Sequence, residues 1–289
     1  MTGPQMFTYT DPHGVKIAAY RYIAAAPRAV VQIAHGIGEH ARRYDAFAAR
    51  LVEEGFTVYA DDHRGHGETG RGQYGGDLSR LGRLGPGGLR ATEDAITQLT
   101  ARIRAEQPGL PVAIFGHSWG SLMTQRILNR APRLWDAVVL SGSAYRTPLH
   151  LNSGNFNKRW DVPEATGYEW LSRDPAVAVA FDADELCFDA DVLGLFGPVD
   201  ALRLFGVPAE NLSPEVPILI VSGSDDPLPL QDSLARLAQA YQERGVHDVS
   251  LRTYPGARHE IVNETNRDEV IADVIGWLDA HLPRTLSKR

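Results

Sequence analysis

Short apolar segments alternate with longer amphipathic segments along most of this chain of 289 residues. The short segments are rich in β-branched and aromatic residues and predict buried strands, whereas the longer ones have the spacing of helices. This alternation is typical of a parallel sheet that helices cover on both faces, so we predict an α/β fold. The predicted strands are residues 7–9, 16–22, 30–34, 57–60, 112–115, 137–140, 218–221 and 249–254. The first two flank the turn-forming sequence DPHG and should pair as a hairpin.

The alternation stops between about residues 145 and 213. That stretch contains several Pro and Gly, clusters of aromatic and acidic residues, and no clear strand. We therefore predict one large α/β domain, built from residues 1–144 and 214–289, with an inserted and mainly helical lobe of residues 145–213. A chain of 289 residues is long for a single compact domain, which agrees with a core that carries an insertion. The Gly-rich stretch 65–88 is predicted to be a loop.

Charge and cysteine content exclude several classes of protein. The chain has 29 Lys and Arg against 36 Asp and Glu, a net charge of −7, which argues against nucleic acid as a partner and against docking on anionic membranes through a basic patch. Its one cysteine, Cys187, cannot form an intramolecular disulfide, and no Cys/His group has zinc spacing, so we predict no metal and no cofactor. No signal-peptide pattern and no membrane-spanning apolar run is present. We expect a cytoplasmic protein.

A nucleophile motif follows the predicted strand 112–115. The sequence GHSWG, residues 116–120, matches G-x-S-x-G, in which a sharp strand-to-helix turn holds the serine in a strained conformation above the sheet. The helix N-terminus beside it favours developing negative charge. Ser118 is therefore the candidate nucleophile. The alternative is that Ser118 only caps a helix between two turn glycines.

A general base and a carboxylate that orients it are needed because a serine hydroxyl is a poor nucleophile at neutral pH. The predicted strand 218–221 leads into Asp225 and Asp226, and the predicted strand 249–254 leads into His259. Both positions follow Ser118 in the chain order Ser, acid, His, and each comes just after a strand. We favour Asp226 over Asp225, which we expect to serve in the turn. The alternative for His259 is an ordinary surface histidine.

The loop after strand 30–34, with the sequence HGIGEH, is the candidate for part of an oxyanion hole. Acyl transfer places negative charge on a carbonyl oxygen, and two backbone N–H groups usually stabilise it. We expect one from Ile37 and the other from Trp119, the residue after the nucleophile. Gly36 and Gly38 would let this loop approach the substrate closely.

A second loop, DHRGHG at residues 62–67, contains histidines and carboxylates that resemble metal ligands. We favour a structural role, in which they are buried hydrogen-bond partners. Residues 65–70 also match G-x-G-x-x-G, but the strand, helix and acidic residue of a dinucleotide site do not follow in the required order. We therefore discard a dinucleotide site.

The segments AHGIGEHARRY, DDHRGHGETG, QPGLPVAIFGHSWGS, SGSDDP and YPGARHE together resemble the α/β-hydrolase superfamily. Within it the chain is most similar to the monoacylglycerol lipase and lysophospholipase branch of serine hydrolases. The resemblance implies a mostly parallel eight-stranded sheet, a cap inserted after the sixth strand, a triad of Ser118, Asp226 and His259, and an oxyanion hole of Ile37 and Trp119. It therefore implies a carboxylic ester hydrolase that acts through an acyl-enzyme.

Two features bear on the substrate. Many members of the family have Met-Gly-Gly after the nucleophile where this chain has Trp119-Gly120-Ser121, and an indole here could narrow the acyl pocket. In the predicted cap, residues 192–196 and 202–205 are apolar, so they either form a lipid portal that contacts a membrane transiently or pack the cap onto the core. We expect a lipid-like ester, a monoacylglycerol or a lysophospholipid.

Three other functions remain open at this point. The first is a carboxylesterase for short acyl chains. The second is an aminopeptidase or amidase, in which acidic cap residues hold the substrate amine; the candidates are Asp182, Asp184, Glu185 and Asp189, although a solvated acidic face explains them equally well. The third is a non-catalytic receptor with a hydrolase fold, which usually lacks a member of the triad.

Overall fold

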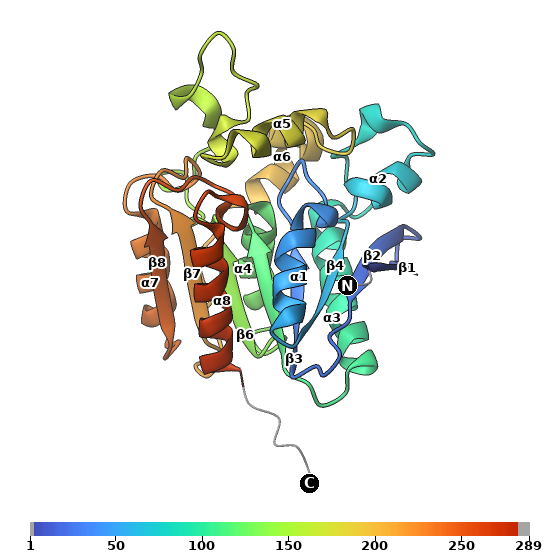
Figure 1. Cartoon of the computed structure of the whole chain (residues 1–289), viewed down its shortest axis with the longest axis vertical. Helices are drawn as coiled ribbons and strands as arrows, with labels where there is room; N and C mark the ends of the chain where they lie inside the picture. Colours follow the sequence, from blue (N-terminus) through green and yellow to red (C-terminus); the bar gives the residue numbers. More distant parts are fainter. Residues whose placement is uncertain (1–2, 283–289) are drawn as a thin grey trace.

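One eight-stranded sheet forms the centre of the protein in the computed structural model, which describes residues 3–282 (Figure 1). Its strands are β1 (Gln5–Thr10), β2 (Lys16–Tyr22), β3 (Ala29–Ala34), β4 (Phe56–Asp61), β5 (Val112–His117), β6 (Ala137–Ser141), β7 (Ile218–Gly223) and β8 (Val249–Tyr254). They lie in the order β1-β2-β4-β3-β5-β6-β7-β8. Only β2 is antiparallel to its neighbours β1 and β4, and all the other pairs are parallel. The predicted fold class, including the first hairpin, is confirmed.

Helices cover both faces of the sheet. The helices are α1 (Asp45–Glu53), α2 (Gly67–Gln73), α3 (Gly88–Glu106), α4 (Trp119–Leu128), α5 (Pro175–Ala183), α6 (Val192–Arg203), α7 (Ser233–Glu243) and α8 (Arg267–His281). In Figure 1, α1 and α8 lie in front of the sheet and α3, α4 and α7 behind it. Two apolar clusters result, and the adjacent residues Val30 and Val31 belong to different clusters because side chains alternate along a strand. Because helices cover both faces, β3, β4 and β5 are buried at every position.

Helix α2 corrects the prediction of a continuous loop over residues 65–88. Glycine has low helix propensity, which is why the sequence indicated a loop. The helix forms because Asp62 accepts a hydrogen bond of 2.8 Å from the N–H of Glu68 in its first turn. The glycines are required by close packing: a Cβ at Gly70 would lie 2.6 Å from the carbonyl carbon of Gly65. Tertiary contacts therefore outweigh propensity here.

The segment between β6 and β7, residues 142–217, contains α5, α6 and the short 3-10 helices Phe156–Arg159 and Glu169–Leu171. We call it the β6–β7 segment. Asp174 starts α5 by accepting a hydrogen bond from the N–H of Ala176, and Pro175 occupies the first turn, where its missing N–H costs nothing. Gly197, with φ of 74°, produces a kink in α6 before Pro198. Figure 1 shows α5 and α6 at one end of the sheet.

Contacts identify the end of the sheet that this segment covers. The N–H of Phe188 donates to the carbonyl of Gly38, 2.9 Å away, in the loop that follows β3. The N–H of Glu260 donates over 2.7 Å to the carbonyl of Leu171, so the segment also contacts the loop that follows β8. Both loops leave the carboxyl ends of parallel strands, where ligands bind in open α/β sheets.

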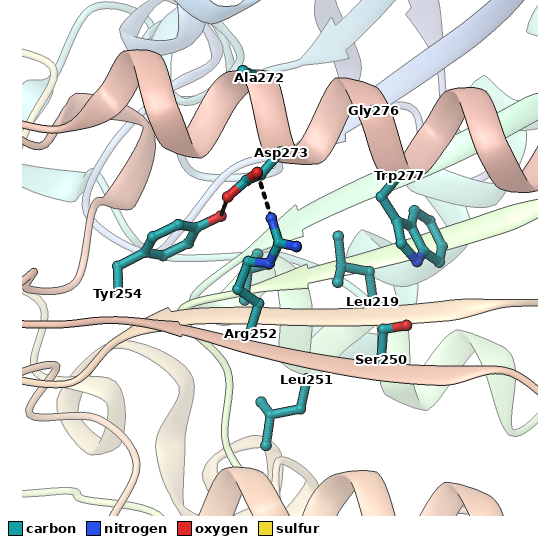
Figure 2. A pocket seen from close by; sticks show the side chains of 10 residues that line it. Leu219, Ser250, Leu251, Arg252, Tyr254, Ala272, Asp273, Gly276 and Trp277 are labelled. Carbon is teal, nitrogen blue, oxygen red and sulfur yellow. Dashed lines mark hydrogen bonds and ion pairs between the residues drawn. The ribbon is translucent and has the colours of Figure 1, made fainter.

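A pocket elsewhere in the protein lies between the edge of the sheet and α8 (Figure 2). Leu219, Arg252, Tyr254, Asp273 and Trp277 are among its lining residues. None of the predicted site residues lines it, so it is separate from the candidate active site. Within residues 3–282, no helix combines the length and the apolar character needed to cross a membrane.

Candidate active site

Ser118 lies in a sharp turn between β5 and α4. Its φ of 51° and ψ of −123° place a residue with a side chain in the left-handed half of conformational space, which is rare and costs free energy. The turn is held by the N–H of Ser118, which donates to the carbonyl of Ser141 at 2.9 Å. A Cβ at Gly116 would lie 2.9 Å from the carbonyl oxygen of Gly120, so the turn needs glycine on both sides of the serine. This is the geometry expected of a nucleophile elbow.

Asp226 and His259 are in contact. Nδ1 of His259 lies 2.9 Å from Oδ1 of Asp226, and both side chains are buried. The same carboxylate accepts hydrogen bonds from the hydroxyl of Ser222 (2.8 Å) and from the N–H of Leu228 (2.9 Å). Because a carboxylate can only accept, Nδ1 of His259 carries the proton and Nε2 is left as the basic nitrogen.

The carboxylate of Asp225, the alternative acid, pairs with an arginine. Its oxygen Oδ2 forms an ion pair of 3.1 Å with Arg159, from the β6–β7 segment. The backbone N–H of Asp225 donates to the carbonyl of Ala257 at 2.9 Å. The two adjacent aspartates therefore contact different partners, and the one that contacts His259 is Asp226.

His259 is in a buried, negatively charged environment. Burial by itself lowers the pKa of His259, but the Asp226 carboxylate has the opposite effect, and the net pKa is raised above its usual value. Nε2 of His259 is buried and has no hydrogen-bond partner among the described residues, Ser118 included. The Trp170 ring, from the β6–β7 segment, covers the imidazole at a centroid distance of 5.0 Å. The basic nitrogen is thus shielded from water and free to accept a proton.

Close packing brings the strand ends together around Ser118 and His259. A Cβ at Gly36, after β3, would lie 3.1 Å from Cβ of Ser118. A Cβ at Gly142, after β6, would lie 3.0 Å from Cε1 of His259. The ends of β3, β5, β6, β7 and β8 therefore contribute to one small region. This agrees with the prediction that sites in such sheets form where several strands end.

The backbone amides of Ile37 and Trp119 are available as hydrogen-bond donors. The structure records no hydrogen bond from either N–H to another of residues 3–282. Glu39 holds the loop that carries Ile37, because its Oε1 accepts hydrogen bonds from the N–H of Gly36 (2.5 Å) and from the hydroxyl of Tyr44 (2.8 Å). Sequence reasoning missed this role of Glu39. The signal that could have revealed it is an acidic residue immediately after two loop glycines.

The indole of Trp119 is almost fully buried beside the nucleophile. It stacks on His66 at a centroid distance of 5.1 Å and contacts Phe196 of α6 at 5.1 Å. In α6, Val192 and Phe196 pack against the core, whereas Leu193 and Leu202 are exposed. The apolar part of the segment therefore packs against the core through some of its residues and faces solvent through others.

Several polar groups of the loop after β4 form structural contacts, although Nε2 of His63 and Nε2 of His66 are buried without a hydrogen-bond partner among the described residues. Asp62 accepts from the hydroxyl of Tyr20 at 3.1 Å and from the N–H of Ala41 at 2.9 Å. Arg64 forms a buried ion pair with Asp11. Burial lowers the pKa of His66 to about 3, so His66 is neutral at physiological pH. These contacts support the structural interpretation over a metal site.

A different group of potential metal ligands was not predicted. His40, Asp184 and Cys187 have ligand atoms within 4.8 Å of one another. His40 follows β3, whereas the other two lie in the β6–β7 segment, more than a hundred positions away in the sequence. No spacing rule could have found this group, because only the fold brings its members together.

Comparisons with known proteins agree with this geometry. A family model described as "Serine aminopeptidase, S33" matches residues 25–266. A monoacylglycerol lipase of Mycolicibacterium smegmatis is 33% identical over 268 residues, which cover 89% of this chain and 90% of that protein. Human monoglyceride lipase is 26% identical, with 90% of this chain and 87% of that protein covered. The crystal structure of a highly thermostable carboxyl esterase from Bacillus coagulans, in complex with glycerol, has a TM-score of 0.83, 25% identity, and coverage of 97% and 99% of the two chains.

The sheet and the residues at its carboxyl end define an α/β-hydrolase. More narrowly, the chain belongs to the S33 serine aminopeptidase family. Its similarity to monoacylglycerol lipases over most of its length confirms the resemblance inferred from the sequence. The predicted class of enzyme, a carboxylic ester hydrolase, is supported by the same relatives.

Proposed function

We propose that this chain hydrolyses monoacylglycerols or lysophospholipids through a triad of Ser118, His259 and Asp226. The observation that carries the proposal is the buried contact of 2.9 Å between His259 and Asp226, which leaves a shielded basic nitrogen at the same end of the sheet as the strained Ser118. The names of the relatives, which include monoacylglycerol lipases, support the substrate class.

The first half of the reaction forms an acyl-enzyme. His259 accepts the hydroxyl proton of Ser118 at Nε2 while the serine oxygen attacks the ester carbonyl carbon. The negative charge that develops on the carbonyl oxygen is stabilised by the N–H groups of Ile37 and Trp119. The tetrahedral intermediate collapses, His259 returns the proton to the leaving alcohol, and the acyl group stays on Ser118.

Hydrolysis then repeats these steps with water as the nucleophile. His259 takes a proton from water, and the resulting hydroxide attacks the acyl carbon. The fatty acid leaves when Ser118 regains its proton from His259. Throughout, the Asp226 carboxylate stabilises the imidazolium and keeps the ring in the required tautomer.

We further propose that residues 145–213 act as a cap that selects the substrate. The segment supplies Trp170 over His259 and Phe196 against Trp119, so it contacts both the base and the residue beside the nucleophile. Substrate selectivity in a shared fold resides in such site-specific insertions.

The second candidate function is an esterase for shorter acyl chains. The packing of Trp119 against Phe196 is the observation that favours it. An indole in this position occupies volume that an acyl chain could otherwise fill. Rates on p-nitrophenyl esters from C2 to C16, measured together with rates on monoacylglycerols, distinguish the two. A maximum at long chains supports the lipase, and a maximum at C2–C4 with no turnover at C12 contradicts it.

Covalent labelling tests the triad independently of the substrate. A fluorophosphonate probe should label the wild-type protein, and Ser118→Ala should abolish labelling and reduce turnover by about a million-fold. Ser79→Ala, on an exposed serine, is the matched control and should label like the wild type. If the probe does not label the wild-type protein, the proposal that it is an enzyme is wrong, and the non-catalytic receptor is favoured instead.

The peptidase alternative needs free acidic groups in the β6–β7 segment. Asp184 contacts His40 at 2.9 Å and Glu185 forms an ion pair with Arg71, so neither is free to bind an amine. Asp182 and Asp189 are exposed, as expected for a solvated acidic face. Turnover of proline-naphthylamide with no turnover of acylglycerols would support the peptidase instead.

A further inference from the structure

The loop that carries the candidate oxyanion amide and the β6–β7 segment meet at a group of side chains with metal-binding chemistry. We propose that His40, Asp184 and Cys187 form a binding site for one divalent zinc-type cation. Nε2 of His40 and Oδ2 of Asp184 are 2.9 Å apart, and the Cys187 sulfur lies within 4.8 Å of both. This proposal is independent of the hydrolase mechanism.

The three ligand atoms are close enough to reach a tetrahedral site after small movements. Zinc–ligand bonds of about 2.0–2.3 Å place ligand atoms about 3.3–3.7 Å apart, so the three atoms need to move by only a few tenths of an ångström to about 1 Å. Imidazole, thiolate and carboxylate are all ligands of zinc, and three protein ligands leave a fourth position for water. The ligand set also selects against Mg²⁺ and Ca²⁺, which prefer oxygen alone.

The charges around the group favour a cation. The positive charge of the Arg43 guanidinium acts on Cys187, and by itself it would oppose a bound cation. Arg43 is, however, paired with both Glu39 (3.2 Å) and Glu260 (2.7 Å), so more than one carboxylate balances its charge. Asp184 then adds a negative charge whose Oδ2 contacts His40 and whose Oδ1 accepts a hydrogen bond of 2.9 Å from the N–H of Leu186.

The thiol of Cys187 supplies a proton when metal binds. Burial raises the pKa of this thiol above its usual value, so the free thiol is protonated at neutral pH. Metal binding replaces that S–H bond with a sulfur–metal bond and releases the proton to solvent. A complex of the dication with one thiolate, one carboxylate and one neutral imidazole carries no net charge, which suits a site that is partly buried.

A bound cation would join two segments that already touch. His40 lies three positions after Ile37, and Phe188, next to Cys187, donates its N–H to Gly38 in the same loop. The metal would therefore fix the β6–β7 segment onto this loop. It should raise the melting temperature of the protein, because it binds the folded state only.

Titration with Co²⁺ of the reduced, metal-free protein tests the site without any measurement of activity. Since Cys187 is the one cysteine of the chain, a thiolate-to-cobalt charge-transfer band can arise only there. We expect the wild type to show this band at one Co²⁺ per chain, Zn²⁺ to remove it by competition, and Cys187→Ser to lack it. Asp184→Asn and His40→Gln should each weaken binding at least tenfold.

Asp189→Asn is the matched control, because it removes an exposed acidic residue from the same segment and should bind like the wild type. Circular dichroism of each variant checks that it is folded. The absence of the band in the wild type would overturn the proposal. It would equally be overturned if Asp184→Asn and His40→Gln bound with wild-type affinity, since Cys187 alone would then be the ligand.

Discussion

The Asp226 carboxylate controls both the tautomer and the pKa of His259. Burial lowers the pKa of the imidazole, but the Asp226 carboxylate raises it, together with the charges of Glu260 and Glu39, and the net pKa lies above the usual value. His259 is a base only when neutral, so activity rises with pH through this pKa. The position of the acidic limb of the pH profile therefore measures the influence of Asp226.

Asp226→Asn should reduce kcat by about 10⁴-fold, because the wrong tautomer of His259 is then favoured. The remaining activity should have its acidic limb at lower pH than the wild type. The negative charge that raises the pKa of His259 is then lost, whereas burial still lowers this pKa. The kcat/KM profile against pH of a soluble ester is the measurement. Asp225→Asn, whose carboxylate pairs with Arg159, is the control and should keep the wild-type limb; an unmoved limb in Asp226→Asn would contradict the assignment.

Glu39 positions the loop that presents the amide of Ile37. Its carboxylate accepts from the N–H of Gly36 at 2.5 Å, and an amide in its place would present an N–H₂ group to one of these contacts. Glu39→Gln should lower kcat by up to about 100-fold, because small displacements of catalytic groups are costly. KM should change little. Glu53→Gln, on an exposed residue of α1, is the control; an equal loss in both variants would exclude a specific role for Glu39.

Some candidate site residues could be proposed from the sequence and others could not, for a physical reason. The candidates Ser118, Asp226 and His259 each follow a recognisable strand, so their location at one end of the sheet follows from the topology of a parallel sheet. The choice between Asp225 and Asp226 depends on side-chain direction, and the sequence could only favour one. His40 and Cys187 meet because the β6–β7 segment folds back over the loop after β3, and no local pattern encodes that contact.

At the scale of elements, strands and amphipathic helices were the easiest to predict. Strand β8 covers the expected residues 249–254, and β2 covers the expected residues 16–22. These elements have strong apolar periodicity, so their type depends little on context. Helix α2 was missed because its glycines serve tertiary contacts that only the folded protein reveals.

Helix α4 packs so closely on β3 that its first turn tolerates no side chain at Gly120. A Cβ there would overlap the carbonyl oxygen of Ala34. Because this oxygen belongs to the backbone of a central strand, it cannot move aside without distorting the sheet. Gly120→Ala should lower the free energy of unfolding by about 1–3 kcal/mol or more. Gly276→Ala is the matched control in α8, where a Cβ meets nothing within 4 Å, and it should raise stability by about 0.5–1 kcal/mol. Urea unfolding measures both, and equal effects would contradict the packing argument.

For the molecule as a whole, negative charge and contact with lipid are compatible. The net charge of −7 disfavours docking through basic residues, but exposed apolar side chains can enter a membrane surface without them. Such residues gather on α6, where Leu193 is 60% exposed and Leu202 is 67% exposed. Val192 and Phe196 of the same helix pack on the core. If the exposed leucines of α6 enter a membrane surface, the candidate active site would therefore lie close to lipid.

The double variant Leu193→Glu/Leu202→Glu tests this surface. Burial of one leucine side chain is worth about 1.5–3 kcal/mol, so two charges in their place should weaken binding to phosphatidylcholine vesicles at least about tenfold. Hydrolysis of monoacylglycerol in the vesicles should fall in parallel, whereas hydrolysis of soluble p-nitrophenyl acetate should not change, because both side chains face solvent. Met6→Glu, on the exposed face of β1, is the control and should leave both rates as in the wild type. If the double variant binds vesicles like the wild type, the lipid reaches the site by another surface; if both rates fall together, the variant has damaged the site itself.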